Sequence, residues 1–159
     1  MPLAELNIAQ MREPLESDLL FEFRTFIAPI NELADSSPGF VWRFAPDIVE
    51  NGTDQPHPFD EDELLINMSV WEELESLREF AFKTSHSYFV RHGKKWFHKM
   101  QHPHLVLWWV PAGHEPTLEE ARERLDLLRS EGPTERAFNF GRPFAEPETF
   151  GIDVSAARR

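Results

Sequence analysis

The sequence predicts an α+β fold in which one antiparallel sheet carries helices on one face. The first observation is the order of hydrophobic patterns, which is strand, helix, strand, strand, helix, strand, followed by an extra helix and strand. The first six elements have the βαββαβ order of a ferredoxin-like fold. The second observation is the length of 159 residues, which suits one domain with its own core. We expect this domain at residues 1–148 and a flexible tail at residues 149–159.

Hydrophobic periodicity and turn residues divide the domain into eight elements. Apolar residues alternate in the predicted strands and recur at helical spacing in the predicted helices. In chain order, the elements are a strand at 3–10, a helix capped by Ser17 or Asp18 and ended at 36–39, a strand at 40–44, a strand at 63–70, a helical region from 72 to about 97, a strand at 104–110, a helix after Thr117 and a strand at 137–144. Residues 47–62 are polar and are expected to form an excursion between two strands.

Specific residues predict the helix boundaries. Ser69–Glu72 and Thr117–Glu120 have the capping-box pattern, so each predicts the start of a helix, and Ser69 is expected to be a cap rather than a nucleophile. We expect Pro29 to kink the first helix and the long helical region to break near residues 84–85. Gly132 and the proline after it are expected to stop the last helix.

The sheet face turned away from the helices is expected to be apolar as well. Trp42 or its neighbours, Leu65, and one of Trp108 and Trp109 fall on that face in the predicted register. Leaving such side chains in water costs about 25 cal/mol per Å² of apolar surface. A second copy that packs sheet against sheet removes this cost, so we predict a homodimer.

Net charge and cysteine content exclude several classes of function. With 28 acidic against 16 basic residues the chain carries a charge of −12, so we expect neither nucleic acid nor a membrane as a partner. The lack of cysteine excludes disulfides, thiolate metal sites and cysteine catalysis. Because the chain shows no long apolar run and no basic secretory start, we expect a cytoplasmic location.

Positive charge and histidine concentrate between residues 80 and 114. This stretch has no Asp or Glu and holds six of the seven histidines. Its cations are Lys83, Arg91, Lys94, Lys95 and Lys99. A local positive field of this kind favours an anionic ligand. The alternative is that these cations pair with acidic residues of other helices or of the second copy.

His86 is the candidate proton-transfer residue. Phe82, His86 and Phe89 share one face of a continuous helix, which places the imidazole between aromatic rings. A reference pKa of about 6.5 suits a general acid or base. The alternative is a buried histidine with a structural role, hydrogen-bonded to a backbone carbonyl.

Three other histidines have part of the pattern of a metal site. His98 and His102 have i, i+4 spacing, and His104 follows closely. Pro103 interrupts a helix at this point, and no acidic residue or cysteine is near in the sequence. We therefore expect no metal site here.

Polar residues in the predicted sheet suggest a small-molecule site. Asn7, Arg43, Asn67 and one or both of Trp108 and Trp109 are expected to project from the sheet away from the helices. A few polar groups in an aromatic-lined cavity are typical of sites for small molecules. A register slip of one residue turns Arg43 and Asn67 to the helix side instead.

Motifs spread over about residues 3–145 resemble a known family. They are Trp71-Glu72, Ser85-His86, Lys95-Trp96-Phe97, the stretch Leu105-Val106-Leu107-Trp108-Trp109-Val110-Pro111-Ala112-Gly113-His114, Pro116-Thr117, Gly132-Pro133-Thr134 and Ala137-Phe138-Asn139-Phe140. Together they resemble the DUF3291 family of uncharacterised bacterial proteins, within the dimeric α/β-barrel superfamily. The resemblance implies a ferredoxin-like protomer that dimerises into a barrel. The superfamily includes cofactor-independent monooxygenases, haem enzymes and isomerases, and a shared fold does not choose among them.

The resemblance implies a protein that binds a small aromatic or anionic molecule and acts, without a cofactor, as a monooxygenase or isomerase. In that reaction Arg43 and Asn67 hold the substrate anion and His86 acts as the base. The expected substrate contacts are Asn7, Trp108, Trp109 and Tyr88. One alternative is haem binding through His86 or His92, and another is a non-catalytic binding or assembly protein.

Overall fold

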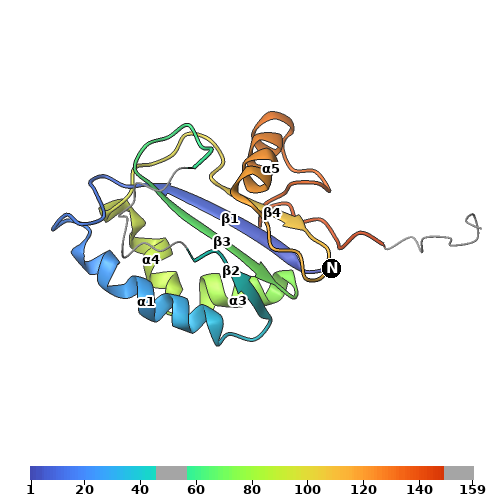
Figure 1. Ribbon diagram of the computed structural model, residues 1–159, viewed down its shortest axis with the longest axis horizontal. Helices are drawn as coiled ribbons and strands as arrows, with labels where there is room; N and C mark the ends of the chain where they lie inside the picture. Colours follow the sequence, from blue (N-terminus) through green and yellow to red (C-terminus); the bar gives the residue numbers. More distant parts are fainter. Residues whose placement is uncertain (46–56, 149–159) are drawn as a thin grey trace, which may run out of the picture.

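The computed structural model of the chain describes residues 1–45 and 57–148. In this part of the chain, four strands form one open antiparallel sheet in the order β2-β3-β1-β4 (Figure 1). The elements are β1 (Leu3–Gln10), α1 (Phe21–Asp35), β2 (Phe40–Arg43), β3 (Leu64–Trp71), α3 (Leu74–Lys83), α4 (His86–His92), the 3₁₀-helix η1 (Gly93–Lys95), β4 (Leu105–Trp109) and α5 (Leu118–Glu131). The predicted tail, and most of the predicted excursion, lie outside the described residues. The structure is a mixed α+β fold, as predicted.

The central strand β1 buries side chains on both of its faces. Leu3 packs in one apolar cluster with Ala34 of α1 and Leu77 of α3. Leu6 points to the opposite face and packs in a second cluster with Leu125 of α5. Accordingly, α1, α3 and α4 lie on one side of the sheet and α5 lies on the other (Figure 1). We call these two sides the α1 face and the α5 face.

Helix α5 covers part of the surface on which we expected a second copy. Leu125 of α5 packs with Leu6 of β1 and with Val106 and Trp108 of β4, and all four side chains are fully buried. The prediction that helices cover one face of the sheet only is therefore wrong. Over β1 and β4 the chain itself removes the apolar surface from water. Toward β2, the large side chains of Trp42, Phe44 and Ile66 stay half-buried.

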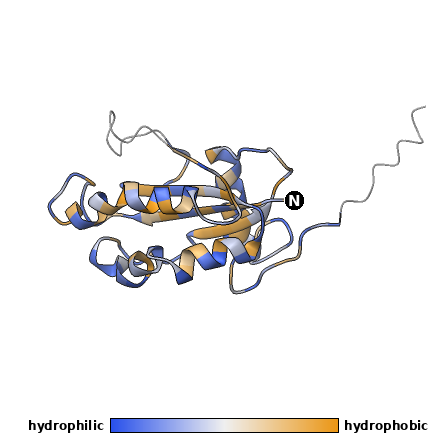
Figure 2. Ribbon diagram, turned by 90° about the horizontal axis from the view of Figure 1, so that it is seen from below, coloured by the Kyte–Doolittle hydropathy of each residue, from blue (hydrophilic) through white to orange (hydrophobic). Residues whose placement is uncertain are grey.

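A third apolar cluster joins α1 to α4 at the other end of the sheet. Trp96 is buried, and its ring centroid lies 5.6 Å from that of Phe23 in α1 and 5.8 Å from that of Phe89 in α4. Met11 and Phe97 form an isolated β-bridge, so the chain after η1 returns to the end of β1. Two clusters therefore hold the helix layer of the α1 face, one at each end of β1. Hydrophobic residues line the strands between the layers, whereas the helices carry many hydrophilic turns (Figure 2).

Strand β3 is shifted by one residue from the predicted 63–70 and ends at Trp71. It continues through Ser69 to Trp71, and α3 begins only at Leu74. The capping-box prediction at Ser69 is therefore wrong. The hydroxyl group of Ser69 bonds instead across the strand pair to Glu5 of β1, a partner that is distant in the sequence.

Helix α1 also begins later than predicted. Ser17 and Asp18 accept backbone N–H groups in turns that precede the helix, and neither side chain caps it. Pro29 lies inside α1, which continues beyond it to Asp35. No helix in the described ranges is long and apolar enough to cross a bilayer.

The predicted break in the long helical region is confirmed, because α3 and α4 are separate helices. Thr84 lies at the break with an extended backbone (φ −107°, ψ −176°), and its hydroxyl group donates to the Phe80 carbonyl at 2.5 Å. Since one continuous helix is absent here, Phe82, His86 and Phe89 do not share a helical face, and this part of the prediction is wrong.

The segment after α5 departs from the predicted last strand. Residues 137–144 are joined to β4 by one isolated bridge between Leu107 and Phe138, and no regular strand forms there. Phe138 is nevertheless fully buried against β4. In contrast, α5 begins after a Thr117 cap and ends before Gly132, as predicted.

Truncation of Leu125 tests the packing of α5 on the sheet. Because Leu125 is fully buried among β1 and β4 side chains, we expect Leu125→Ala to lower the free energy of unfolding by about 2–5 kcal/mol. Glu123→Ala, at an exposed position of the same helix, is the matched control, with an expected change within about 0.5 kcal/mol. Urea denaturation measures both, and equal stabilities would show that α5 does not pack on this face.

Candidate functional site

Four polar side chains lie next to one another in the middle of the α1 face. Glu5 of β1 is opposite Ser69 of β3, and Asn7 is opposite Asn67. Residues directly opposite in an antiparallel pair point to the same face, and alternate residues of a strand do so too. All four therefore share the face of Leu3. We call Glu5, Asn7, Asn67 and Ser69 the polar strip.

The polar strip lies between two apolar clusters. Trp71, two residues beyond Ser69, packs with Leu3, and Leu65, two residues before Asn67, packs with Trp96. Between these clusters Asn67 is exposed and Asn7 is half-buried, although both face the helix layer. The helix layer thus covers Glu5 but leaves the asparagine end of the strip accessible to solvent.

A chain of hydrogen bonds fixes the covered end of the strip. The indole Nε1 of Trp71 donates to the Ser69 Oγ at 2.9 Å. The Ser69 Oγ in turn donates to the Glu5 Oε2 at 3.0 Å. Trp71 is fully buried, and Glu5 and Ser69 are 5% and 7% exposed. Because the serine hydroxyl has both a donor and an acceptor as partners, its proton is directed toward the carboxyl group.

Burial raises the pKa of Glu5 from its ordinary 4.5 to about 8, and the hydrogen bond from Ser69 opposes part of this rise. Among the described ion pairs none involves Glu5, so no cation compensates a negative charge there. The carboxyl group is therefore mostly protonated at pH 7. A neutral carboxylic acid of this kind can donate a proton to a bound molecule and take it back.

Aromatic stacking connects the strip to His86. The Trp71 ring stacks on Phe80 with 5.2 Å between centroids, and Phe80 lies 4.9 Å from the His86 ring. The Nδ1 atom of His86 lies 3.2 Å from the Ala81 carbonyl oxygen, which matches the structural role given above as the alternative. Burial lowers the pKa of His86, and the bond to Ala81 opposes this in part, so the imidazole is neutral at pH 7.

The other predicted site residues have partners of their own. Arg43 forms an ion pair with Asp35 of α1 at 2.7 Å, so its guanidinium is not free to hold a substrate anion. The Tyr88 hydroxyl donates to Glu22 at 2.9 Å, and its ring stacks on His92 with 4.3 Å between centroids. These contacts fasten α1 to β2 and α4 to α1.

The predicted side of the sheet also needs correction. Asn7, Arg43 and Asn67 point to the α1 face, which helices cover, and not to the side away from the helices. Trp109 shares that face, and its Nε1 donates to the carbonyl oxygen of Phe144, after α5, at 3.0 Å. Trp108 points to the α5 face, so the two tryptophans do not contribute to one site.

Glu5 and Ser69 were not among the predicted site residues. In the sequence, Glu5 follows the alternation of β1 and is typical of a residue on a solvated strand face. Only the cover on both faces of β1 makes it buried. One pattern in the sequence could have indicated the strip. Each of two otherwise apolar strands has two polar residues at alternate positions, Glu5 and Asn7 in one and Asn67 and Ser69 in the other.

The motif from Trp108 to His114 fastens α5 to the sheet. Glu120, in the first turn of α5, accepts a hydrogen bond from Trp108 Nε1 at 2.9 Å, and its other oxygen lies 2.6 Å from His114 Nε2. The Glu120 backbone N–H donates to the Thr117 hydroxyl, which completes the cap. Trp108 and His114 are therefore accounted for by packing on the α5 face, whereas Trp109 of the same motif lies on the α1 face.

No metal centre is evident in the part of the chain that the structure describes. There, no three His, Asp or Glu side chains gather in an arrangement that could hold a metal ion. His98, His102 and His104 are all exposed.

The fold and the polar strip define an α+β protein whose sheet buries the carboxyl group of Glu5. Beside it lie Asn7 and Asn67, which are more accessible to solvent than Glu5. Residues 2–152 match the family described as "Domain of unknown function (DUF3291)", and the chain belongs to this family. The family assignment made from the motifs is thus confirmed. No curated protein and no solved structure matches the chain.

The raised pKa of Glu5 predicts how stability depends on pH. Between pH 4.5 and 8 the folded protein keeps a proton on Glu5 that the unfolded chain releases. The free energy of unfolding therefore falls as the pH rises through this window, by up to roughly 5 kcal/mol. We expect Glu5→Gln, which is neutral at every pH, to lack this fall.

Urea denaturation at pH 4.5 and pH 8.5 measures the difference. Glu5→Gln is expected to match the wild type at pH 4.5 and to exceed it in stability at pH 8.5. Glu123→Gln, at an exposed glutamate, controls for the loss of one carboxylate and is expected to follow the wild type. The same pH dependence in all three proteins would mean that Glu5 is not buried as described.

Proposed function

We propose that this chain is a small-molecule enzyme of the isomerase type, in which Glu5 moves a proton on a substrate bound over the polar strip. The observation that carries the proposal is the buried carboxyl group beside accessible amides: Glu5 is 5% exposed, whereas Asn67 is exposed on the same sheet face. A substrate above Asn67 and Asn7 would find amide donors and acceptors in front of it and a carboxylic acid at the covered end.

The protonation state of Glu5 favours isomerisation over oxygenation. A cofactor-independent monooxygenase needs a base to deprotonate its substrate, and at pH 7 Glu5 is mostly in its acid form. In an isomerase, the acid form of Glu5 would first donate its proton to the carbonyl oxygen of the substrate. The carboxylate left behind would then remove a proton from the neighbouring carbon, so Glu5 returns to its acid form. Ser69 would hold the carboxyl group in position, and Trp71 would hold Ser69. The neutral imidazole of His86 lies beyond Phe80 and is a positioning residue in this proposal.

The substrate class follows from the borders of the strip. Apolar and aromatic side chains lie at both ends, around Trp71 and around Trp96. They favour a flat, largely apolar molecule with one enolisable carbonyl group, whose oxygen would accept a hydrogen bond from Asn7 or Asn67.

Deuterium exchange into enolisable aromatic ketones in D₂O, followed by NMR, tests the reaction. We expect exchange with the wild type, a loss of at least about 100-fold in Glu5→Gln, and unchanged exchange in the control Glu22→Gln. Binding is read from the side-chain amide signals of Asn7 and Asn67, with Asn139, outside the strip, as the reference. Exchange that survives in Glu5→Gln would overturn the role of Glu5, and amide signals that never shift would overturn the site.

The fold of the protomer supports membership of the dimeric α/β-barrel superfamily. The strand order β2-β3-β1-β4 is that of a ferredoxin-like βαββαβ unit, with α1 and the α3–α4 pair as its two crossovers. In this proposal a second copy packs on the part of the α5 face near β2, where Trp42, Phe44 and Ile66 are half-buried.

Sedimentation velocity tests the homodimer. We expect a dimer at 10 μM wild type and a shift toward protomer in Trp42→Asp, because the new carboxylate would be desolvated at the contact. Val41→Asp, at the neighbouring exposed position, is the control. A wild-type protein that sediments as a protomer would refute the dimer but would leave the polar strip untouched.

The remaining functions weighed from the sequence have less support. For haem binding, His86 and His92 each place Nδ1 near a backbone carbonyl, at 3.2 and 2.8 Å, which leaves Nε2 as the ligand atom. Each imidazole also lies against an aromatic ring, Phe80 or Tyr88, which restricts the approach of a large planar group. A purely structural role gives no reason for a carboxyl group buried at an energetic cost.

A further inference from the structure

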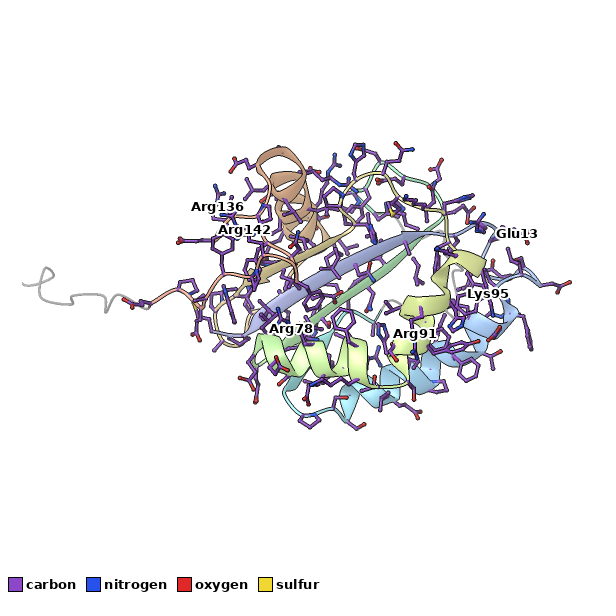
Figure 3. The ribbon with its side chains drawn as sticks, turned by 180° about the vertical axis from the view of Figure 1, so that it is seen from behind. Glu13, Arg78, Arg91, Lys95, Arg136 and Arg142 are labelled. Carbon is purple, nitrogen blue, oxygen red and sulfur yellow. The ribbon has the colours of Figure 1, made fainter. Side chains whose placement is uncertain are left out.

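A row of cationic side chains occupies one side of this acidic protein. Figure 3 shows Arg136 and Arg142 after α5, Arg78 on α3, Arg91 on α4 and Lys95 in η1, all spread along the same side. We call these five residues the basic band. Glu13 is the acidic residue labelled in this view, at the end near Lys95.

None of the five cations is in an ion pair within residues 1–45 and 57–148. The described pairs of arginine and lysine involve Arg43, Lys83, Arg122 and Arg129 instead. In a chain with 28 acidic and 16 basic residues, a cation has many carboxylates available to it. Arg12, Arg24, Lys94, Lys99 and Arg124 are also in no ion pair among the described residues. What sets the basic band apart is that its five cations face one side of the molecule (Figure 3). Cations gathered in this way favour an anionic ligand on that side.

Neighbouring contacts hold several of these side chains in place. The Arg78 Nη2 donates to the Phe140 carbonyl at 3.3 Å. The Arg142 guanidinium lies 5.7 Å from the centroid of the Phe144 ring, and the Lys95 ammonium lies 5.8 Å from that of Trp96. Cations placed in this way lose less conformational entropy on binding an anion than free surface side chains do.

An aromatic pair, exposed Phe82 and half-buried Phe140, lies next to Arg78 of the band. Phe82 of α3 is 51% exposed, and its ring meets Phe140 edge-on with 5.1 Å between centroids. Arg78 contacts Phe140 as well, so the pair and the arginine form one surface. Arginine together with exposed aromatic rings is the composition typical of protein-interaction hot spots.

We propose that the basic band binds an extended acidic segment of a partner protein, with an apolar side chain of that segment on Phe82 and Phe140. The band crosses three elements and the segment after α5, so a ligand that meets all of it must be elongated (Figure 3). Carboxylates match arginine in planar, two-bond geometry. The net charge of −12 opposes a long nucleic acid or an anionic membrane, because each would extend over acidic parts of the surface as well as the band. A short peptide would lie on the band alone, and salt screens acidic residues more than about 8 Å away from it.

Fluorescence anisotropy with the full chain tests the proposal. The probe is a labelled 12-residue peptide of alternating Glu and Gly with a central Leu-Phe pair, and its control has Gln in place of every Glu. We expect the acidic peptide to bind, the Gln peptide not to bind, and the affinity to fall steeply between 50 and 300 mM NaCl.

Substitutions in the chain locate the surface. Arg91→Gln and Arg142→Gln are each expected to weaken binding by roughly 2- to 5-fold, and Phe82→Ser is expected to weaken it without changing the salt dependence. Arg122→Gln, on α5 and already paired with Asp60 and Asp126, is the matched control and should not change the affinity. Circular dichroism confirms that each variant is folded.

Each other outcome contradicts the proposal in a defined way. Equal binding of the Gln peptide would exclude charge as the basis of recognition. Binding to phosphatidylserine vesicles or to single-stranded DNA, with none to the acidic peptide, would assign the band to a different class of partner. Equal weakening by Arg122→Gln would show a general effect of net charge.

Discussion

The contact between Glu5 and Ser69 is the constraint on which the arrangement of the α1 face depends. A carboxyl group in the central strand of a covered sheet is tolerated when it is neutral and hydrogen-bonded. Ser69 supplies that bond only because β3 continues as a strand past it, and this continuation delays the start of α3 until Leu74. Trp71 then closes the chain of hydrogen bonds and begins the stack that reaches Phe80 and α3.

Helices cover both faces of the sheet, but the two faces differ in composition. On the α5 face, apolar residues of β1 and β4 pack directly against α5, and Glu120 ties the helix to Trp108. On the α1 face, two apolar clusters support the helix layer at its ends and leave polar residues between them. The α1 face therefore has accessible polar groups, whereas the residues of β1 and β4 on the α5 face are buried against the helix.

Positive charge gathers on one side of the surface, just as polar side chains gather on one face of the sheet. The strongly acidic composition keeps the whole molecule negative, while the basic band stays free of the ion pairs found elsewhere among the described residues. The cation-rich stretch of the sequence contributes Arg91 and Lys95 to this band, and α3 and the segment after α5 contribute the rest (Figure 3). Segments distant in the chain thus build a surface that no local stretch of sequence contains.

The sequence by itself determined several of the elements. The alternation in β1, the break between α3 and α4, the Thr117 cap of α5 and the α+β class all follow from local periodicity and local hydrogen bonding. The family also followed from the sequence, because its motifs are short and contiguous.

The tertiary structure decided what no local pattern contains. It placed α5 on the second sheet face, turned Asn7 and Asn67 toward the helix layer, paired Arg43 with Asp35 and enclosed Glu5. The physical reason is that burial, and with it the pKa of a carboxyl group, depends on every layer packed around a residue, whereas periodicity reports only the strand that carries it.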